Sequence, residues 1–169
     1  GRLNAIGFHP TDEDVFWVGA PAGGLWKTTD GGDSWSSNTD DLATLGVSSI
    51  VVNPSNTNIM YIGTGDRDAG DAPGRGVYKS VDGGANWTQS NSGMGNLEVN
   101  VMVMHPSNPS YIVAATSGGI YRSQNAGSTW NLESSNTSSY KDLKFRPGSS
   151  TVLYTTCLLY TSPSPRDGL

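Results

Sequence analysis

The sequence predicts an all-β protein assembled from repeated four-stranded antiparallel sheets. An eight-residue pattern, Ser/Thr-x-Asp/Asn-x-Gly-x-x-Trp, occurs three times and is called the turn motif below. Its tryptophans, Trp35, Trp87 and Trp130, are 52 and 43 residues apart. Four short strands in a period of about 40–50 residues are typical of a β-propeller blade. We therefore expect a β-propeller fragment of about three four-stranded blades and half of a fourth.

Each turn motif predicts a tight turn between two strands. Aspartate followed by glycine favours a hairpin, because glycine reaches positive φ and aspartate accepts hydrogen bonds from nearby backbone N–H groups. The Ser or Thr hydroxyl two residues earlier caps the same turn. The tryptophan is expected to pack between neighbouring sheets, with its N–H needing one partner. The residues assigned this structural role are Thr28, Asp30, Gly32, Trp35, Ser80, Asp82, Gly84, Trp87, Ser123, Asn125, Gly127 and Trp130.

A longer repeat surrounds the turn motif and sets the order of the strands. Each unit opens with an apolar run that ends in an X-Pro step, followed by polar turn residues, a second β-run, a glycine-led third strand and, in the three complete units, the turn motif. The four strands are named A to D here. The predicted blades are residues 3–37, 47–89, 99–132 and an incomplete 141–156, all within one domain of residues 1–156. Polar linkers over 38–46, 90–98 and 133–140 connect each D strand to the next A strand.

Composition narrows the classes of partner. The 169 residues include 22 Gly and only 15% charged residues, which is typical of a turn-rich β protein. The net charge of −5 and the lack of a Lys/Arg cluster argue against nucleic acid. No apolar run approaches the ~20 residues that span a bilayer, so we expect no membrane span. Cys157 is the only cysteine, which excludes an internal disulfide.

The last residues break the repeat. After Thr156 the repeat predicts a continuation like Ser-Gly-Gly-Ile-Tyr, but the chain continues as Cys-Leu-Leu-Tyr-Thr-Ser-Pro-Ser-Pro-Arg-Asp. Residues 157–167 resemble the translation of a sequencing-library adapter, and a genuine Pro-rich tail is the alternative. We expect residues 157–169 to be a non-native tail and the natural chain to continue into further blades.

Some polar residues that look catalytic occupy repeated positions. His9 and His105 precede a proline at a position that is Asn or Arg in the other units, which indicates a turn. Asp30 and Asp82 align with Asn125. Asparagine can make the hydrogen bonds of the turn but cannot act as a general acid. The repeat therefore assigns these residues to structure.

One irregularity stands out in the repeat, the B–C loop of blade two. The segment 63–75 is about eight residues longer than its counterparts in blades one and three. In an antiparallel blade the B–C loops and the blade-to-blade linkers share one face, called the B–C face below, where a ligand site is expected. The predicted ligand-contacting residues of this loop are Asp66, Arg67, Asp68, Asp71 and Arg75.

The carboxylates of this loop suggest two kinds of chemistry. Asp66, Asp68 and Asp71 offer hard oxygen ligands for Ca²⁺, although the later Glu of a calcium loop is absent. Alternatively, Asp66 or Asp68 would act as acid or base on a polysaccharide, which requires a second carboxylate about 5–10 Å away. The third interpretation is a solvated, glycine-rich loop that only shapes the face. We expect no cofactor, with Ca²⁺ as the one candidate.

The whole repeat resembles the Asp-box, or BNR, repeat of β-propellers. Such repeats occur in sialidases, sortilin-type ectodomains and xyloglucan-cleaving glycoside hydrolases, where the box is structural. The runs Gly19-Ala-Pro-Ala-Gly-Gly-Leu-Trp-Lys-Thr-Thr-Asp-Gly-Gly32 and Ile62-Gly-Thr-Gly-Asp66 are similar to sortilin-like BNR proteins of bacteria. The resemblance covers residues 3–156 and implies an extracellular or cell-surface protein of bacterial origin.

Two functions follow from this resemblance. The first is a non-catalytic scaffold that binds protein or polysaccharide through the B–C face. The alternative is a fragment of a xyloglucanase-like glycoside hydrolase. That family is expected to carry a catalytic Asp in the B–C region of its first blade, where this chain has Ala20-Pro21-Ala22. A sialidase would need an arginine cluster opened by a Phe/Tyr-Arg-Ile-Pro-like motif, which this sequence lacks. We therefore expect a binding scaffold rather than an enzyme.

Overall fold

The computed structural model describes residues 1–68, 70 and 72–157, which form β-strands and no helix. The strands make three four-stranded antiparallel sheets and one two-stranded sheet, each in sequential order. Blade one contains β1 (Ala5–Phe8), β2 (Phe16–Ala20), β3 (Gly24–Thr28) and β4 (Ser36–Ser37). Blade two contains β5 (Val47–Val52), β6 (Met60–Thr64), β7 (Val77–Ser80) and β8 (Thr88–Gln89). Blade three contains β9 (Val99–His105), β10 (Asn108–Thr116), β11 (Gly119–Ser123) and β12 (Asn131–Leu132), and blade four contains β13 (Tyr140–Phe145) and β14 (Leu153–Cys157).

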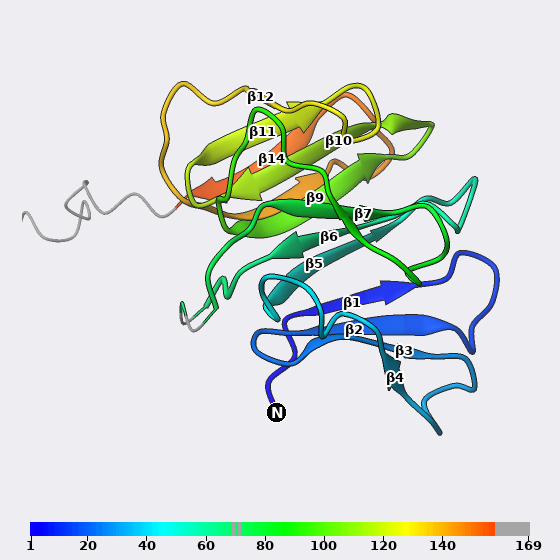
Figure 1. Ribbon diagram of the computed structural model, residues 1–169. Coiled ribbons are helices and arrows are strands. Elements are labelled where there is room, and N and C mark those ends of the chain that lie inside the picture. Colours follow the sequence, from blue (N-terminus) through cyan, green and yellow to red (C-terminus); the bar gives the residue numbers. More distant parts are fainter. Residues whose placement is uncertain (69, 71, 158–169) are drawn as a thin grey trace, which may run out of the picture.

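The blades follow one another in an arc, with their A strands as neighbours. Strand β5 contacts both β1 and β9, and β9 contacts β13. Figure 1 shows the sheets stacked in chain order from blue to orange, with the B–C face on the left, where the chain enters β1. The architecture is that of a β-propeller arc, which confirms the fold class predicted from the period of the turn motif. Within the described residues there is no helix that could cross a membrane.

The hydrophobic core lies between the blades because each sheet alternates its apolar side chains between two neighbours. Trp17 and Leu25 of blade one pack against Ile62 of blade two, and all three are buried. The B strand of blade two has a glycine where the next blade comes closest. A Cβ atom added to Gly63 would lie 2.7 Å from Cγ1 of Val99. Glycine at this position therefore permits the close approach of blade three.

The turn motifs form the same hydrogen-bond network in blades one and two. The Ser80 hydroxyl accepts the N–H of Gly84 at 2.8 Å and donates to Oδ1 of Asp82 at 2.8 Å. Asp82 also accepts the backbone N–H of Asn86 at 2.8 Å and its side-chain amide at 2.7 Å. Blade one repeats these bonds with its own hydroxyl and carboxylate. The carboxylate thus closes the turn by accepting hydrogen bonds.

Blade three keeps this network although an amide replaces the carboxylate. Oδ1 of Asn125 accepts the N–H of Thr129 at 2.9 Å, and its amide nitrogen donates to the Thr129 hydroxyl at 2.8 Å. One hydrogen bond has only reversed its direction. The turn therefore needs a side-chain acceptor at this position and does not need a charge.

The tryptophans of the turn motif are less uniform than the sequence predicts. Trp130 is 2% exposed and donates its ring N–H to the carbonyl of Ser90 in the preceding linker at 2.7 Å. Trp35 is 39% exposed, and its ring N–H bonds to Gly32 within the same turn at 3.0 Å. The ring nitrogen of Trp87 is buried with no hydrogen-bond partner in the part of the chain that the structure describes. Of the three, only Trp130 is both buried between blades and bonded through its ring N–H to a neighbouring segment, as the sequence predicts.

Hydrogen bonds in the turn motif make its stability depend on pH. Bonds from Ser34 to Asp30 and from Asn86 to Asp82 lower the pKa of each carboxyl to about 2. Because the folded-state pKa lies below the ordinary value of 3.8, the contribution is complete above about pH 4 and is lost as the pH falls through 2.

We expect the double variant Asp30→Asn/Asp82→Asn to fold, because asparagine already closes the turn of blade three. It should melt below the wild type at pH 7, and the gap should close as the pH falls to about 2. Melting temperatures at pH 7, 4 and 2 check this. A gap that stayed constant over that range would show that the carboxylate charge has no part in the turn.

Candidate functional site

The base of the long B–C loop of blade two is closed by the same hydrogen bond as the base of its short counterpart in blade three. The Thr64 hydroxyl donates to the carbonyl of Gly76 at 2.7 Å. In blade three the Thr116 hydroxyl donates to the carbonyl of Gly119 at 2.7 Å and closes a tight turn. Residues 65–75, called the insertion loop below, therefore extend an intact blade without distorting it.

Asp66 anchors the insertion loop to blade one. Its side chain has 0% exposure, and Oδ2 lies 2.5 Å from the Nη2 atom of Arg2. Oδ1 accepts the side-chain amide of Asn4 at 3.2 Å and the backbone N–H of Asp68 at 3.3 Å. A buried carboxylate is tolerated when it is paired and hydrogen-bonded in this way. Asp66 is thus turned inward, away from any ligand on the surface.

Several described residues of the insertion loop pack against the two linkers that flank blade two, residues 38–46 and 90–98. A Cβ atom added to Gly74 would lie 2.4 Å from the backbone nitrogen of Glu98, and one added to Gly65 would lie 2.9 Å from Cγ of Glu98. Ala72 is buried at 6% exposure. Glycine is needed at position 74 because the two segments touch backbone to backbone there, and at position 65 because the side chain of Glu98 leaves no room for a Cβ atom.

The A strands of blades two, three and four share a β-bulge at the B–C face. The bulged residues are Ser48, Asn100 and Lys141. Bulges redirect side chains. Here two of the three donate to the first residue of the next A strand, from Ser48 to the Val99 carbonyl and from Asn100 to the Tyr140 carbonyl at 2.7 Å.

Lys141 ties the insertion loop to blade four. Its ammonium group donates to the carbonyl of Arg67, and it lies 3.4 Å from Oδ1 of Asn100, which is fully buried. With Asp66 held on blade one, the insertion loop spans the B–C face from blade one to blade four. A hollow of about 490 Å³ lies at its blade-four end and is lined by Arg67, Asp68, Lys141 and Thr156, together with Cys157, the first residue of the tail that the sequence predicts to be non-native.

Of the loop residues predicted to contact a ligand, Asp68 is exposed and Arg67 is half-buried. Nε of Arg67 lies 3.4 Å from Oδ1 of Asp68, and the two side chains are 35% and 49% exposed. Nε of Arg75 is buried and has no hydrogen-bond partner among the residues that the structure describes. Asp71 lies outside those residues. The structure therefore brings the side chains of Arg67 and Asp68 together at the surface, whereas the side chain of Asp66 is buried.

The predicted calcium ligands do not form a cage within the described residues. No group of three or more His, Cys, Asp or Glu side chains that could hold a metal occurs there. Both carboxylate oxygens of Asp66 receive nitrogen donors, from Arg2 and from Asn4. Calcium needs those oxygens as ligands. Both oxygens of Asp66 are therefore already engaged in the hydrogen bonds that anchor the loop.

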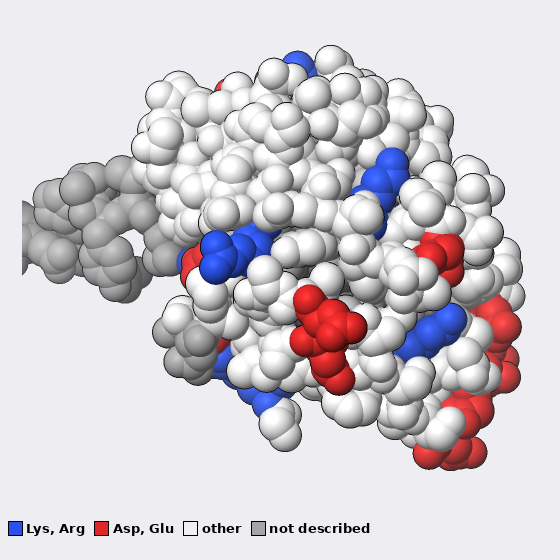
Figure 2. Space-filling view, in the orientation of Figure 1, with Lys and Arg blue, Asp and Glu red and all other residues white. Residues whose placement is uncertain are grey.

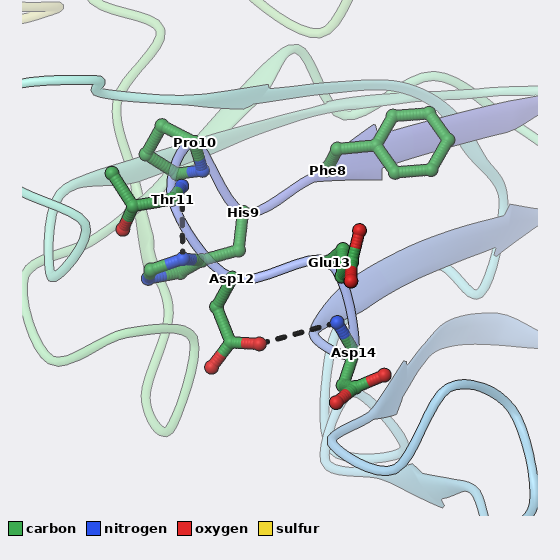
Figure 3. Close-up of a pocket in the computed structure, with 7 residues that line it drawn as sticks. All are labelled: Phe8, His9, Pro10, Thr11, Asp12, Glu13 and Asp14. Carbon is green, nitrogen blue, oxygen red and sulfur yellow. Dashed lines mark hydrogen bonds between the residues drawn. The ribbon is translucent and has the colours of Figure 1, made fainter.

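A second hollow, of about 850 Å³, lies at the A–B turn of blade one. Figure 3 shows that the three carboxylates of this turn point in different directions, and that Asp12 accepts the N–H of Asp14 while His9 accepts that of Thr11. The distances are 3.1 and 3.5 Å. His105 accepts the N–H of Ser107 in the same way, at 3.2 Å. These side chains cap a repeated turn.

Charge is unevenly distributed over the surface. Figure 2 shows a run of acidic side chains along the lower right edge, over the A–B and C–D hairpins of blade one, whereas elsewhere in this view, including the left side near the B–C face, acidic and basic side chains are mixed. The acidic residues of those hairpins include Asp12, Glu13, Asp14, Asp30 and Asp33. Much of the net charge of −5 therefore lies away from the insertion loop.

Comparison with known proteins supports the fold. No family model and no curated protein matches the sequence. A crystal structure of an ancestral GH74 enzyme matches 79% of the chain at 27% identity, with a TM-score of 0.65. The GH74 enzyme of Niastella koreensis matches 90% at 24% identity, with a TM-score of 0.74. A structure of YCF48 bound to D1 peptide matches 86% at 19% identity, with a TM-score of 0.62.

The chain spans only part of each of these proteins. It covers 18% and 24% of the two GH74 enzymes and 45% of YCF48. The arc of blades and these likenesses define the class of the protein as a β-propeller. Among its neighbours are both glycoside hydrolases and a protein seen bound to a peptide.

Several residues of the site escaped the sequence analysis. Arg2 lies outside the repeat, and nothing in the sequence connects it with Asp66. Asn100 and Lys141 had a detectable signal, because a polar residue follows the first apolar residue of each A strand in blades two to four. That regular polar position was readable from the aligned units.

Proposed function

We propose that this chain is part of an extracellular or cell-surface β-propeller that binds a polysaccharide on its B–C face without cleaving it. The observation that carries the proposal is the burial of Asp66, whose side chain has 0% exposure and is paired with Arg2. Asp66, one of the two catalytic candidates of the sequence, cannot contact a substrate in this position. What the insertion loop offers at the surface is Arg67 and Asp68, a hydrogen-bonding pair suited to sugar hydroxyls.

The likeness to GH74 enzymes supports a polysaccharide over other ligands. The ancestral GH74 enzyme shares 27% of its residues with this chain over the matched region. YCF48, the neighbour bound to a peptide, shares 19%. A protein ligand is accordingly the second possibility. An extracellular location is proposed from the resemblance of the repeat to sortilin-like BNR proteins of bacteria.

A glycoside hydrolase is the competing function, because two structural neighbours are GH74 enzymes. Hydrolysis requires a pair of carboxylates about 5–10 Å apart that flank the scissile bond. Asp66 would have to leave its pair with Arg2 to take part, and Asp68 lies beside the guanidinium of Arg67. This arrangement favours binding without cleavage.

Affinity electrophoresis in gels containing xyloglucan, xylan or polygalacturonate tests the proposal, together with an assay for released reducing ends. We expect retardation by at least one polysaccharide and no release. The variant Arg67→Ala/Asp68→Ala should weaken binding by about tenfold or more, since each lost charged hydrogen bond costs roughly 1.5–3 kcal/mol.

A control for this variant is Glu13→Ala/Arg146→Ala, which makes the same change in charge on the opposite face and should bind like the wild type. Retardation by none of the polysaccharides would overturn the proposal. Release of reducing ends that Asp68→Ala abolishes would establish the hydrolase instead.

A further inference from the structure

The hollow between the insertion loop and blade four contains a positive charge without a matching negative charge. The Lys141 ammonium group is held by two neutral oxygens, the carbonyl of Arg67 and Oδ1 of Asn100. Among the residues that the structure describes, no carboxylate lies within ion-pair distance of it. A partly buried charge is costly when it is unpaired. An anionic group of a ligand would supply the missing partner.

Lys141 is held in place firmly enough to serve as a binding group. Asn100 is fully buried, and its amide nitrogen donates to the carbonyl of Tyr140 at 2.7 Å. That bond fixes the amide so that its oxygen faces Lys141. The β-bulge at Lys141 directs this side chain toward the insertion loop. Little conformational freedom would be lost when an anion binds, which favours affinity.

Arg67 adds a second cation to the same hollow. Its Nε atom lies 3.4 Å from Oδ1 of Asp68, and within the described residues its two terminal nitrogens donate no hydrogen bond. A guanidinium fork suits a carboxylate, which it binds through two parallel hydrogen bonds. Arg67, Lys141 and Asp68 together give the hollow a net charge of about +1.

Asp68 limits the kind of anion that fits. Its carboxylate would repel a chain of consecutive acidic groups, but it accepts hydrogen bonds from hydroxyl groups. Thr156, which also lines the hollow, adds a hydroxyl that can donate or accept. The volume of about 490 Å³ lies within the usual range of small-molecule sites. The ligand should therefore carry one carboxylate together with several hydroxyls.

The geometry points to a subsite for a uronic acid unit of an acidic polysaccharide, with the sugar carboxylate between Lys141 and Arg67 and the ring hydroxyls toward Asp68. This inference rests on the proposed polysaccharide-binding function and specifies the class of polysaccharide. No covalent step is involved.

Isothermal titration with four probes tests the inference: oligogalacturonate, alginate oligomers, neutral xyloglucan oligomers and poly-glutamate. We expect at least one uronate oligomer to bind about tenfold more tightly than the neutral oligomer, with an affinity that falls as NaCl is raised. Lys141→Gln and Arg67→Gln should each lower uronate affinity by about tenfold. Arg146→Gln, which removes a positive charge on the opposite face, should leave it unchanged. Asp68→Asn should raise the affinity for poly-glutamate.

Arg67→Gln keeps the carbonyl that holds Lys141, so it tests the site even if Lys141→Gln loosens the loop. Equal affinity for neutral and uronate oligomers, unaffected by either substitution, would overturn the uronate subsite and leave polysaccharide binding in place. Binding of poly-glutamate without binding of any glycan would overturn the polysaccharide-binding function as well.

Discussion

Replacing Trp130 with alanine is expected to lower the free energy of unfolding by about 3–5 kcal/mol, the usual cost of removing a fully buried tryptophan. Trp130 is 2% exposed and packs in the cluster between blades two and three. Its ring N–H donates to the carbonyl of Ser90 at 2.7 Å, and its backbone N–H donates to that of Ser92 at 2.8 Å. The truncation would leave a cavity and an unpaired carbonyl in the linker.

The matched control is Trp35→Ala, at the same position of the first turn motif. Trp35 is 39% exposed, and its ring N–H bonds within its own turn. It still contacts Phe16 edge-on, with ring centroids 5.3 Å apart. We expect a loss of about 1 kcal/mol. Urea denaturation followed by fluorescence measures both variants. Equal losses would mean that burial between blades does not decide the contribution of this tryptophan.

The fold was predictable because the same signals recur in every unit. The turn motif fixes the position of the C–D hairpin, the X-Pro step fixes the A–B turn, and the polar linkers separate the blades. A strand or turn predicted in one unit can be compared with the equivalent residues of the other units. The structure places β7 and β8 on either side of the second turn motif, as the sequence predicts. Strand ends differ by a residue, as where β14 extends to Cys157.

The repeat also explains why the turn residues could be set apart from the catalytic candidates. Asn125 makes the same turn as Asp82 with one hydrogen bond reversed, from its amide nitrogen to Thr129. A position that works with either side chain has no need of an acid. The same logic identified His9 and His105 as turn residues. Their ring nitrogens accept the N–H of the residue two positions later.

The candidate site was less predictable because it lies where the repeat stops. The extra residues of the insertion loop have no equivalent in the shorter B–C loops of blades one and three, so no second copy constrains their conformation. The position of the loop depends on the pair between Asp66 and Arg2, which lie 64 residues apart. It depends also on Lys141, from the incomplete blade. Long-range contacts of this kind leave no periodic pattern in the sequence. The sequence therefore shows which residues the loop contains, but it did not predict that the side chain of Asp66 points inward.

Replacing Asp66 with asparagine is expected to lower the free energy of unfolding by about 2–3 kcal/mol. Breaking a buried ion pair costs about 3–5 kcal/mol when the remaining charge stays buried. The side chain of Arg2 is 42% exposed and can turn to solvent, which reduces the loss. Asparagine keeps an acceptor for Asn4 and for the N–H of Asp68 but removes the charge. The insertion loop should become more sensitive to proteases as its anchor weakens.

Asp68→Asn is the matched control for this substitution. It removes the same charge two residues away from a side chain that is 49% exposed. Exposed pairs contribute about 0–1 kcal/mol, so we expect little change in stability. Urea denaturation and the rate of proteolysis within residues 65–75 measure both variants. Similar losses for the two would show that burial of Asp66 does not matter.

A further pair of variants, Arg2→Met and Arg2→Met/Asp66→Leu, separates an anchor from a catalytic acid. If Asp66 anchors the loop, Arg2→Met alone should destabilise the protein more than Arg2→Met combined with Asp66→Leu, because the single variant leaves a buried carboxylate without its cation. A catalytic acid predicts the opposite pattern: Asp66→Asn would keep wild-type stability while abolishing cleavage of a polysaccharide. The ion pair with Arg2, closed at 2.5 Å on a carboxylate with 0% exposure, favours the anchor.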